Sequence, residues 1–172
     1  CLDLPAQTFV RRYVELEPAA RRLYDQIARA SCAELESGGR VTASIVLTRL
    51  LRLMQLTGGF VQADGSDCAR QAGSAKRGAI VEAFQNDPGV KVFVAQIQTA
   101  GLGITLHAAS AAVFYSLDFN YANYAQALAR IHRIGQAQPG TYIHLLAENT
   151  VVEQVLDALE RKEDLARTIV DG

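Results

Sequence analysis

Two arginines and a glutamine are spaced so that they would share one side of a helix. Gln126, Arg130 and Arg133 stand at positions i, i+4 and i+7 of a segment that we predict to be helical from Tyr121 to Ile134. No acidic residue occurs between Phe119 and Leu146 to neutralise the two arginines. Guanidinium groups placed in this way are suited to binding a phosphate anion.

The same segment has the features that a helix needs to hold those side chains in place. Tyr124, Leu128 and Ile131 form an apolar stripe on the other side, so this stripe is predicted to pack on the core. Asn120 is predicted to cap the amino end of the helix, and Gly135 to stop it at the other end. An ordinary solvated helix face is the alternative, because arginines are common on protein surfaces.

Strand-like and helix-like segments alternate along the second half of the chain. The predicted strands are 90–95, 111–116 and 141–146, and the predicted helices are 76–85, 101–109 and 121–134. This alternation, with almost continuously apolar strands, predicts an α/β fold in which a parallel sheet has helices on both faces. Ligands of such sheets bind beyond the carboxyl ends of the strands, so we expect the site there.

The rest of the chain is predicted to be mainly helical. Residues 4–14 read as an extended or strand segment, and a helix is expected from Pro18 to about Leu35. A second helix begins near Thr42 and is apolar on more than one side. A last helix is predicted at 151–170, with Asn149-Thr150 as its cap. Its apolar side is expected to pack on the α/β part of the chain.

A glycine-rich turn follows the predicted strand 90–95. Gly101 and Gly103, within the segment Gln98–Leu106, would let backbone N–H groups approach an anion or a ribose. A turn that merely enters a helix is the alternative, because Gly-x-Gly alone is a weak signal.

Composition restricts the class of protein. A chain of 172 residues, 49% hydrophobic and 20% charged, suits one globular domain with a helical appendage. The formal net charge is −1, so any contact with nucleic acid must come from a local face. We expect no membrane span and no signal peptide, because no apolar run is long enough and the amino-terminal residues lack the required pattern.

The spacing of cysteines and histidines predicts no metal site. The three cysteines include no Cys-x-x-Cys pair, which argues against a zinc site or a disulfide framework and fits a reducing cytosol. His107 and His144 have no partner at metal-ligand spacing. His132 is expected to make a structural hydrogen bond.

The segment that carries the two arginines has the pattern Gln126-x-x-x-Arg130-x-His132-Arg133-Ile134-Gly135-Gln136. This pattern resembles the last conserved motif of the Swi/Snf-type ATPases of helicase superfamily two. The segment 116–120 is similar to the Asp-x-x-Trp-Asn-Pro motif of that family, and Gly101-Leu102-Gly103 to its fifth motif. The resemblance covers most of residues 4–172. It implies a second RecA-like lobe with a helical protrusion at the amino-terminal side and a bracing helix at the carboxyl-terminal side.

The resemblance assigns roles to individual residues. Arg130 and Arg133 would be arginine fingers that reach the γ-phosphate of ATP, which the first lobe of the same protein would hold. Gly101, Gly103 and Gln126 would contribute to the nucleotide site.

Duplex DNA is the second partner that the resemblance implies. The residues expected at the DNA are Thr99, Arg49, Arg52, Lys76 and Arg77. Arg49 and Arg52 are the only charges of the apolar helix that begins near Thr42, so side chains that extend from a buried helix to the surface remain an equal alternative.

One region departs from the family pattern. Residues 61–75 read as a loop, where the family has the first strand and helix of the lobe, and only Gly73–Arg77 keep its later turn. Either the lobe is truncated internally or residues of this region are missing from the sequence. The predicted division is an interlobe segment and protrusion at 1–60, this loop at 61–75, the RecA-like lobe at 76–150 and the bracing helix at 151–172.

The missing motifs define the expected function. The sequence has no Gly-x-x-x-x-Gly-Lys-Ser/Thr loop and no Asp-Glu-x-His-like pair for Mg²⁺, so ATP and Mg²⁺ would be held mainly by the first lobe. We therefore expect part of a DNA-dependent ATPase that is inactive by itself and intracellular, in the cytoplasm or nucleoid of a bacterium or phage system or in a eukaryotic nucleus. The alternative is a non-catalytic module that binds nucleic acid or protein.

Overall fold

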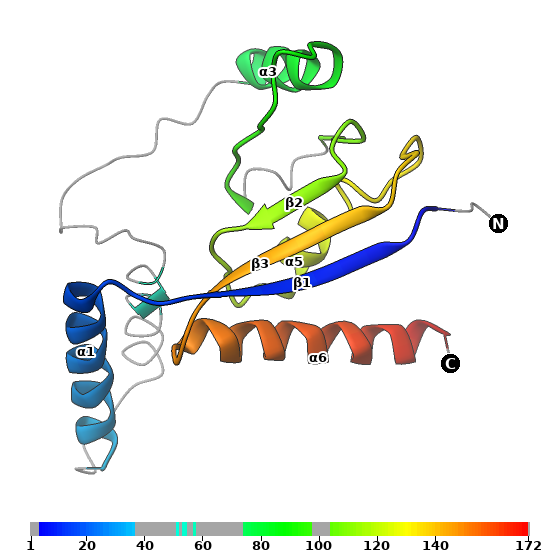
Figure 1. Cartoon of the computed structure of the whole chain (residues 1–172). Coiled ribbons are helices and arrows are strands. Elements are labelled where there is room, and N and C mark those ends of the chain that lie inside the picture. Colours follow the sequence, from blue (N-terminus) through cyan, green and yellow to red (C-terminus); the bar gives the residue numbers. More distant parts are fainter. Residues whose placement is uncertain are drawn as a thin grey trace.

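Three parallel strands form the centre of the computed structural model, which describes residues 4–36, 51, 53–54, 57, 74–97 and 104–171. The strands are β1 (Gln7–Val14), β2 (Ala111–Phe114) and β3 (Gly140–Ala147), in the order β1-β3-β2 (Figure 1). The described helices are α1 (Pro18–Glu36), α3 (Ser74–Asn86), α5 (Tyr121–Leu128) and α6 (Val151–Asp171).

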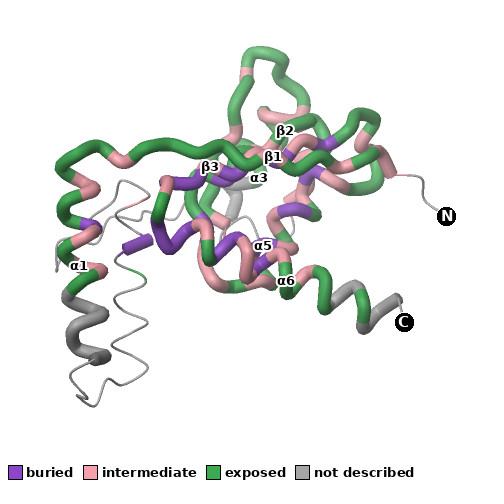
Figure 2. The backbone as a smooth tube through the Cα atoms, turned by 60° about the horizontal axis from the view of Figure 1, so that its bottom comes forward, coloured by how far each residue is buried: buried purple, intermediate pink, exposed green. Residues whose placement is uncertain are grey.

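The strand β3 is the middle of the sheet and carries the core. Tyr142, His144 and Leu146 point to one face and are at most 1% exposed, as the alternation of a strand requires. The helices α5 and α6 lie on this face (Figure 2), where they contribute the largest share of the buried side chains. On the opposite face Val113 of β2 is 58% exposed.

An aromatic stack surrounds the buried histidine of β3. The ring of Phe114 is parallel to His144 at 4.9 Å, and the hydroxyl of Tyr124 lies 3.1 Å from Nε2 of His144. Phe9 of β1 stacks on the same histidine from the other neighbouring strand. Burial, and to a lesser degree the positive charge of Arg11, lowers the pKa of His144 to about 4. The core therefore holds a neutral imidazole.

The amino end of α6 is capped by side chains close to it in sequence. Thr150 Oγ1 accepts from the N–H of Val152 at 3.4 Å, and Glu153 accepts from the N–H of Thr150 at 3.4 Å, which is a capping box. The predicted cap is thus confirmed for Thr150, whereas Asn149 before it adopts a positive φ of 54°. Helix α1 also contacts this turn, because the Val151 N–H donates to the hydroxyl of Tyr24 at 2.7 Å.

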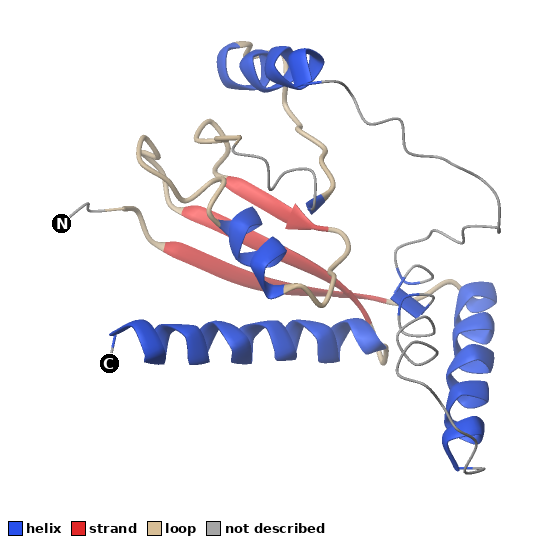
Figure 3. Ribbon diagram, turned by 180° about the vertical axis from the view of Figure 1, so that it is seen from behind, coloured by secondary structure: helices blue, strands red, loops and turns tan. Residues whose placement is uncertain are grey.

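Several predicted elements are confirmed with small shifts of their ends. The extended segment 4–14 contains β1, and the helices expected at 18–35, 76–85 and 151–170 are α1, α3 and α6. Seen from behind, all three strands run side by side and α6 follows beneath them (Figure 3). The helix predicted from Thr42 lies mainly outside the described residues.

The strand predicted at 90–95 is wrong for the described structure. The segment has no regular secondary structure and belongs to no sheet, and Val92 and Val94 are 73% and 89% exposed. A cavity of about 1170 Å³ lies between this segment and β2, and residues of both line it. A strand needs a neighbour at hydrogen-bonding distance, and here the cavity separates the segment from β2.

The helix predicted at 101–109 is also wrong where the structure describes it. Residues 104–110 form an extended segment and a turn at His107-Ala108. Gln85 of α3 binds the backbone here, because it donates to the carbonyl of Thr105 and accepts from the N–H of Ala108. Those two backbone groups are therefore used by a side chain rather than by a helix.

The sheet extends across the boundary that the sequence placed at residue 60. Strand β1 pairs with β3 along its whole length, from Gln7 opposite Gly140 to Val14 opposite Ala147. The first strand of the chain is thus part of the same sheet as the strands of the predicted lobe. Among the described residues, no helix is both long and apolar enough to cross a membrane.

Candidate functional site

Helix α5 begins at the asparagine that the sequence predicted as its cap. Asn120 has extended backbone angles, and its side chain accepts from the N–H groups of Ala122 at 3.0 Å and Asn123 at 3.3 Å. Asp118 accepts in turn from the N–H of Asn120 at 2.8 Å. The segment between β2 and α5 is therefore ordered by its own polar side chains.

The end of α5 differs from the prediction. The helix stops at Leu128, not at Ile134, and the two arginines lie in the turns that follow it. The carbonyl of Leu128 accepts from the hydroxyl of Tyr142 at 2.7 Å, and the carbonyl of Arg130 accepts from the N–H of Leu106 at 2.9 Å. The Leu128 carbonyl also accepts from the N–H of His132 at 3.4 Å, but the N–H groups of Arg130 and Arg133 bond to carbonyls only three and two residues before them, so the regular helical ladder does not continue.

The apolar stripe is confirmed even though the helix is shorter. Tyr124, Leu128 and Ile131 are all buried in the core cluster. Gln126 is exposed on α5. Gly135 has a φ of +100°, so it forms a turn in the region where helix termination was predicted, several residues after the observed end.

The two arginines bind two adjacent residues of the segment 104–110, one residue each. Nη1 of Arg130 donates to the carbonyl of Ile104 at 3.2 Å, and Nη1 of Arg133 donates to Oγ1 of Thr105 at 3.2 Å. Because their acceptors are adjacent in the chain, the two guanidinium groups lie close together. Arg130 is half-buried, whereas Arg133 is exposed.

The arginine pair lies at the amino ends of β2 and β3, and the expectation of a site at the carboxyl ends is wrong for these residues. Residues 104–110 lead directly into β2, and the arginines precede β3. Helix α5 runs from the end of β2 back to the start of β3, as a crossover between parallel strands must. The residues after it therefore emerge at the starting ends of the strands.

Two glutamines that are far apart in the sequence hold the segment 104–110. Gln85 donates to the carbonyl of Thr105 at 2.7 Å and accepts from the N–H of Ala108 at 2.9 Å. Gln136 donates to the carbonyl of Ala109 at 2.8 Å. The roles of Gln85 and Thr105 were not predicted, because no motif spacing connects them with the arginines.

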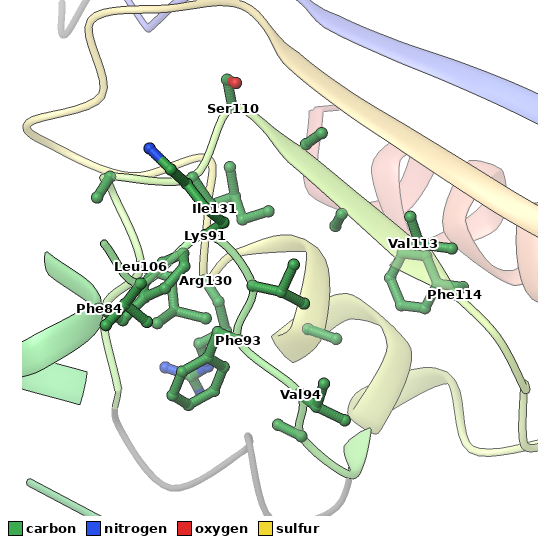
Figure 4. Close-up of a pocket in the computed structure, with 18 of the residues that line it drawn as sticks. Phe84, Lys91, Phe93, Val94, Leu106, Ser110, Val113, Phe114, Arg130 and Ile131 are labelled. Carbon is green, nitrogen blue, oxygen red and sulfur yellow. The ribbon is translucent and has the colours of Figure 1, made fainter. Parts of the chain in front are cut away.

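The half-buried arginine also faces the cavity beside β2. Arg130 and Ile131 line one part of this cavity, and Phe93, Val113 and Phe114 line others (Figure 4). Most labelled side chains around it are apolar, so Arg130 is a cation at the border of an apolar space.

The histidine of the arginine motif makes the structural hydrogen bond that the sequence predicted. Nε2 of His132 lies 2.9 Å from the carbonyl oxygen of Pro5. A carbonyl can only accept, so Nε2 carries the proton. This contact joins the turn after α5 to the residues just before β1.

The remaining predicted site residues are not placed by the structure. Gly101, Gly103, Thr99, Arg49 and Arg52 lie outside the described residues, and Lys76 and Arg77 lie in α3 without described side chains. Among the described residues there is no group of three or more His, Cys, Asp or Glu side chains that could hold a metal ion.

The fold and the paired arginines define a RecA-like α/β lobe of the helicase type. The helicase conserved C-terminal domain family matches residues 26–135, and the chain belongs to this family. The structure is similar to that of the C-terminal part of the Fun30 ATPase domain, with a TM-score of 0.70 and 11% identity, covering 91% of this chain and 90% of the other. At this identity the similarity shows the fold alone.

Curated relatives at higher identity are chromatin-remodelling ATPases. The chain is 31% identical over 94% of its length to the chromatin-remodeling ATPase INO80 of Emericella nidulans. It is 30% identical over 91% of its length to the protein of the same name from Cryptococcus neoformans. The chain spans about a tenth of the length of these relatives. The resemblance to the C-terminal lobe of Swi/Snf-type ATPases is thus confirmed.

Proposed function

We propose that the chain is the second motor lobe of an ATP-driven translocase or remodeller of duplex DNA. Arg130 and Arg133 act as arginine fingers on the terminal phosphate of ATP, which a first lobe of the same protein presents. The lobe works where the DNA is, which is the nucleus in a eukaryotic cell and the cytoplasm or nucleoid in a bacterial or phage system.

The observation that supports this proposal best is the pairing of the arginines on Ile104 and Thr105. A guanidinium has five N–H donors in a fixed plane, and Arg133 uses one Nη1 atom for its contact with Thr105. Arg133 is exposed, so its plane is accessible to a phosphate of another lobe. Two adjacent guanidinium groups match the charge that spreads over the transferred phosphoryl group.

The described side chains of this chain are better suited to binding the triphosphate of ATP than to binding Mg²⁺. Guanidinium groups bind phosphate oxygens, whereas Mg²⁺ needs carboxylates and phosphate oxygens, and the described residues offer no carboxylate cluster. In the proposal the first lobe holds Mg²⁺ and most of the nucleotide. The exposed Gln126, and Gly101 and Gly103, complete the nucleotide site. The DNA contacts of Thr99, Arg49, Arg52, Lys76 and Arg77 remain part of the same proposal.

The arginine assignment is tested in the protein that carries both lobes, by phosphate release from ATP with saturating duplex DNA. We expect Arg133→Ala and Arg130→Ala each to lower kcat by about 10³-fold or more, as loss of an arginine finger does. Arg29→Ala is the matched control, because Arg29 is exposed on α1, beyond the opposite end of the sheet. It should keep normal turnover.

A DNA-binding measurement on the same variants separates catalysis from binding. Affinity for duplex DNA should stay close to the unsubstituted value in both arginine variants, because the proposed contact is with ATP. Normal hydrolysis by both arginine variants would refute the assignment. If the two-lobe protein binds DNA but never hydrolyses ATP, the chain is a non-catalytic binding module.

A further inference from the structure

We propose that Thr105 and Gln85 are positioning residues that set the geometry of the arginine pair. The inference rests on the proposed function, since it concerns the same two guanidinium groups. Neither residue would contact ATP. Their role would be to fix the segment on which both arginines are held.

Thr105 holds one arginine directly and lies next to the residue that holds the other. Its Oγ1 accepts from Nη1 of Arg133 at 3.2 Å, and the carbonyl of Ile104 accepts from Nη1 of Arg130 at 3.2 Å. The separation of the two guanidinium groups is therefore tied to the separation of two neighbouring acceptors. A contact made beforehand restricts the rotamers of a flexible arginine side chain, so the guanidinium group is already in position when the transition state forms.

Gln85 of α3 fixes that segment through its side-chain amide. Its amide nitrogen donates to the carbonyl of Thr105 at 2.7 Å and lies 3.2 Å from Nδ1 of His107. Its amide oxygen accepts from the N–H of Ala108 at 2.9 Å. A single side chain thus binds both ends of the turn after Thr105.

Backbone contacts connect the same segment to the arginine turn. The N–H of Leu106 donates to the carbonyl of Arg130 at 2.9 Å, and Gln136 donates to the carbonyl of Ala109. The contacts therefore form a continuous path from Gln85 on α3 through Thr105 to Arg133. Because Gln85 lies in the last turn of α3, the position of α3 is coupled to the position of the arginines.

Position matters more than presence for a group that acts in a transition state. A misplacement of about 1 Å can lower a rate about 10²-fold while the group itself remains. Loss of the Thr105 hydroxyl should therefore lower kcat without changing ground-state binding of ATP.

The test measures ATP turnover by the two-lobe protein with duplex DNA. We expect Thr105→Val to lower kcat by about 10-fold to 10²-fold with an unchanged KM for ATP, and Thr105→Ser, which keeps the hydroxyl, to restore most of the rate. Gln85→Met should lower kcat in the same way, since it keeps the side-chain length but loses both amide contacts. A merely structural role would instead change the thermal midpoint and leave kcat per folded molecule unaltered.

A double-mutant cycle decides whether Thr105 acts through Arg133. Once Arg133→Ala is present, Thr105→Val should cause little further loss, because the partner of the hydroxyl is already gone. Independent, fully additive losses would overturn the inference, as would normal kcat in Thr105→Val and Gln85→Met. If the arginine variants themselves keep normal turnover, the proposed function fails instead. If the arginine variants are impaired and the two positioning variants are not, only the present inference fails.

Discussion

His144 is a buried residue that is uncharged in the folded chain near neutral pH. It is 1% exposed, lies against Phe114 and Tyr124, and has the guanidinium of Arg11 on the neighbouring strand. Burial is the main cause of its pKa of about 4, and the like charge of Arg11 adds to it. The unfolded chain has a normal histidine, with a pKa near 6.5. The unfolded state therefore takes up a proton first as the pH falls.

The stability of the chain should decrease on acidification because of this residue. Above about pH 6.5 the stabilising contribution of the neutral His144 is fully present. Between about pH 6.5 and pH 4 the free energy of unfolding should fall by up to ~1.4 kcal/mol per pH unit because of His144 alone. From pH 7 to pH 5 the loss is about 2 kcal/mol. Urea unfolding at the two pH values measures it.

The control for that measurement is His144→Gln, which keeps polar atoms but cannot be protonated in this range. The loss of stability between pH 7 and pH 5 should be smaller by about 2 kcal/mol in the variant. An equal pH dependence of the two proteins would show that folding does not lower the pKa of His144.

At the scale of elements, the end of α5 is decided by partners that are far away in the chain. Tyr142 on β3 donates to the carbonyl of Leu128, and its hydroxyl also accepts from Gln7 of β1 at 3.4 Å. Burial raises the pKa of Tyr142, in keeping with its neutral hydroxyl in the core. The helix is therefore joined to the two strands that lie beside it at the position where it stops.

Removing this hydroxyl should destabilise the chain. Tyr142→Phe deprives the buried carbonyl of Leu128 of its O–H donor, so the free energy of unfolding should fall by about 1–3 kcal/mol. Tyr115→Phe is the matched control, because Tyr115 is 58% exposed and should show almost no change. Denaturant titration of the two variants compares them directly. Equal stability of Tyr142→Phe and the unsubstituted chain would show that the contact does not hold the end of α5.

At the scale of the whole molecule, the described elements form one RecA-like lobe, which the proposed function pairs with a second. The sheet, α5 and α6 form a single core, and the arginine pair lies at one end of that sheet. The chain spans about a tenth of the length of its chromatin-remodelling relatives. The proposal requires a partner surface with a bound nucleotide on the side of the arginines.

The chain by itself should therefore not hydrolyse ATP. Phosphate release with ATP, Mg²⁺ and duplex DNA should be at the level of the blank, and addition of the first lobe should restore it, because the P-loop and the metal ligands are expected there. The same mixture with an Arg133→Ala chain should stay inactive. Hydrolysis by the unsubstituted chain alone would mean that it has a complete site of its own.

The sequence determined the features that depend on near neighbours. The cap at Asn120, the apolar stripe of Tyr124, Leu128 and Ile131, and the class of fold were all predicted from local spacing. A side chain that caps a helix or faces its core acts within a few residues, so periodicity shows it. The motif around Arg130 and Arg133 likewise indicated the family.

Only the tertiary structure decided where the arginines are held. Their acceptors at Ile104 and Thr105 lie 26 and 28 residues away, and Gln85 lies a further 20 residues before Thr105. Hydrogen bonds across such distances leave no periodic trace, because the spacing depends on how the chain crosses the sheet. For the same reason the sequence placed the end of α5 too late: the carbonyls of Leu128 and Arg130 bind Tyr142 and Leu106, and these distant contacts leave no local pattern.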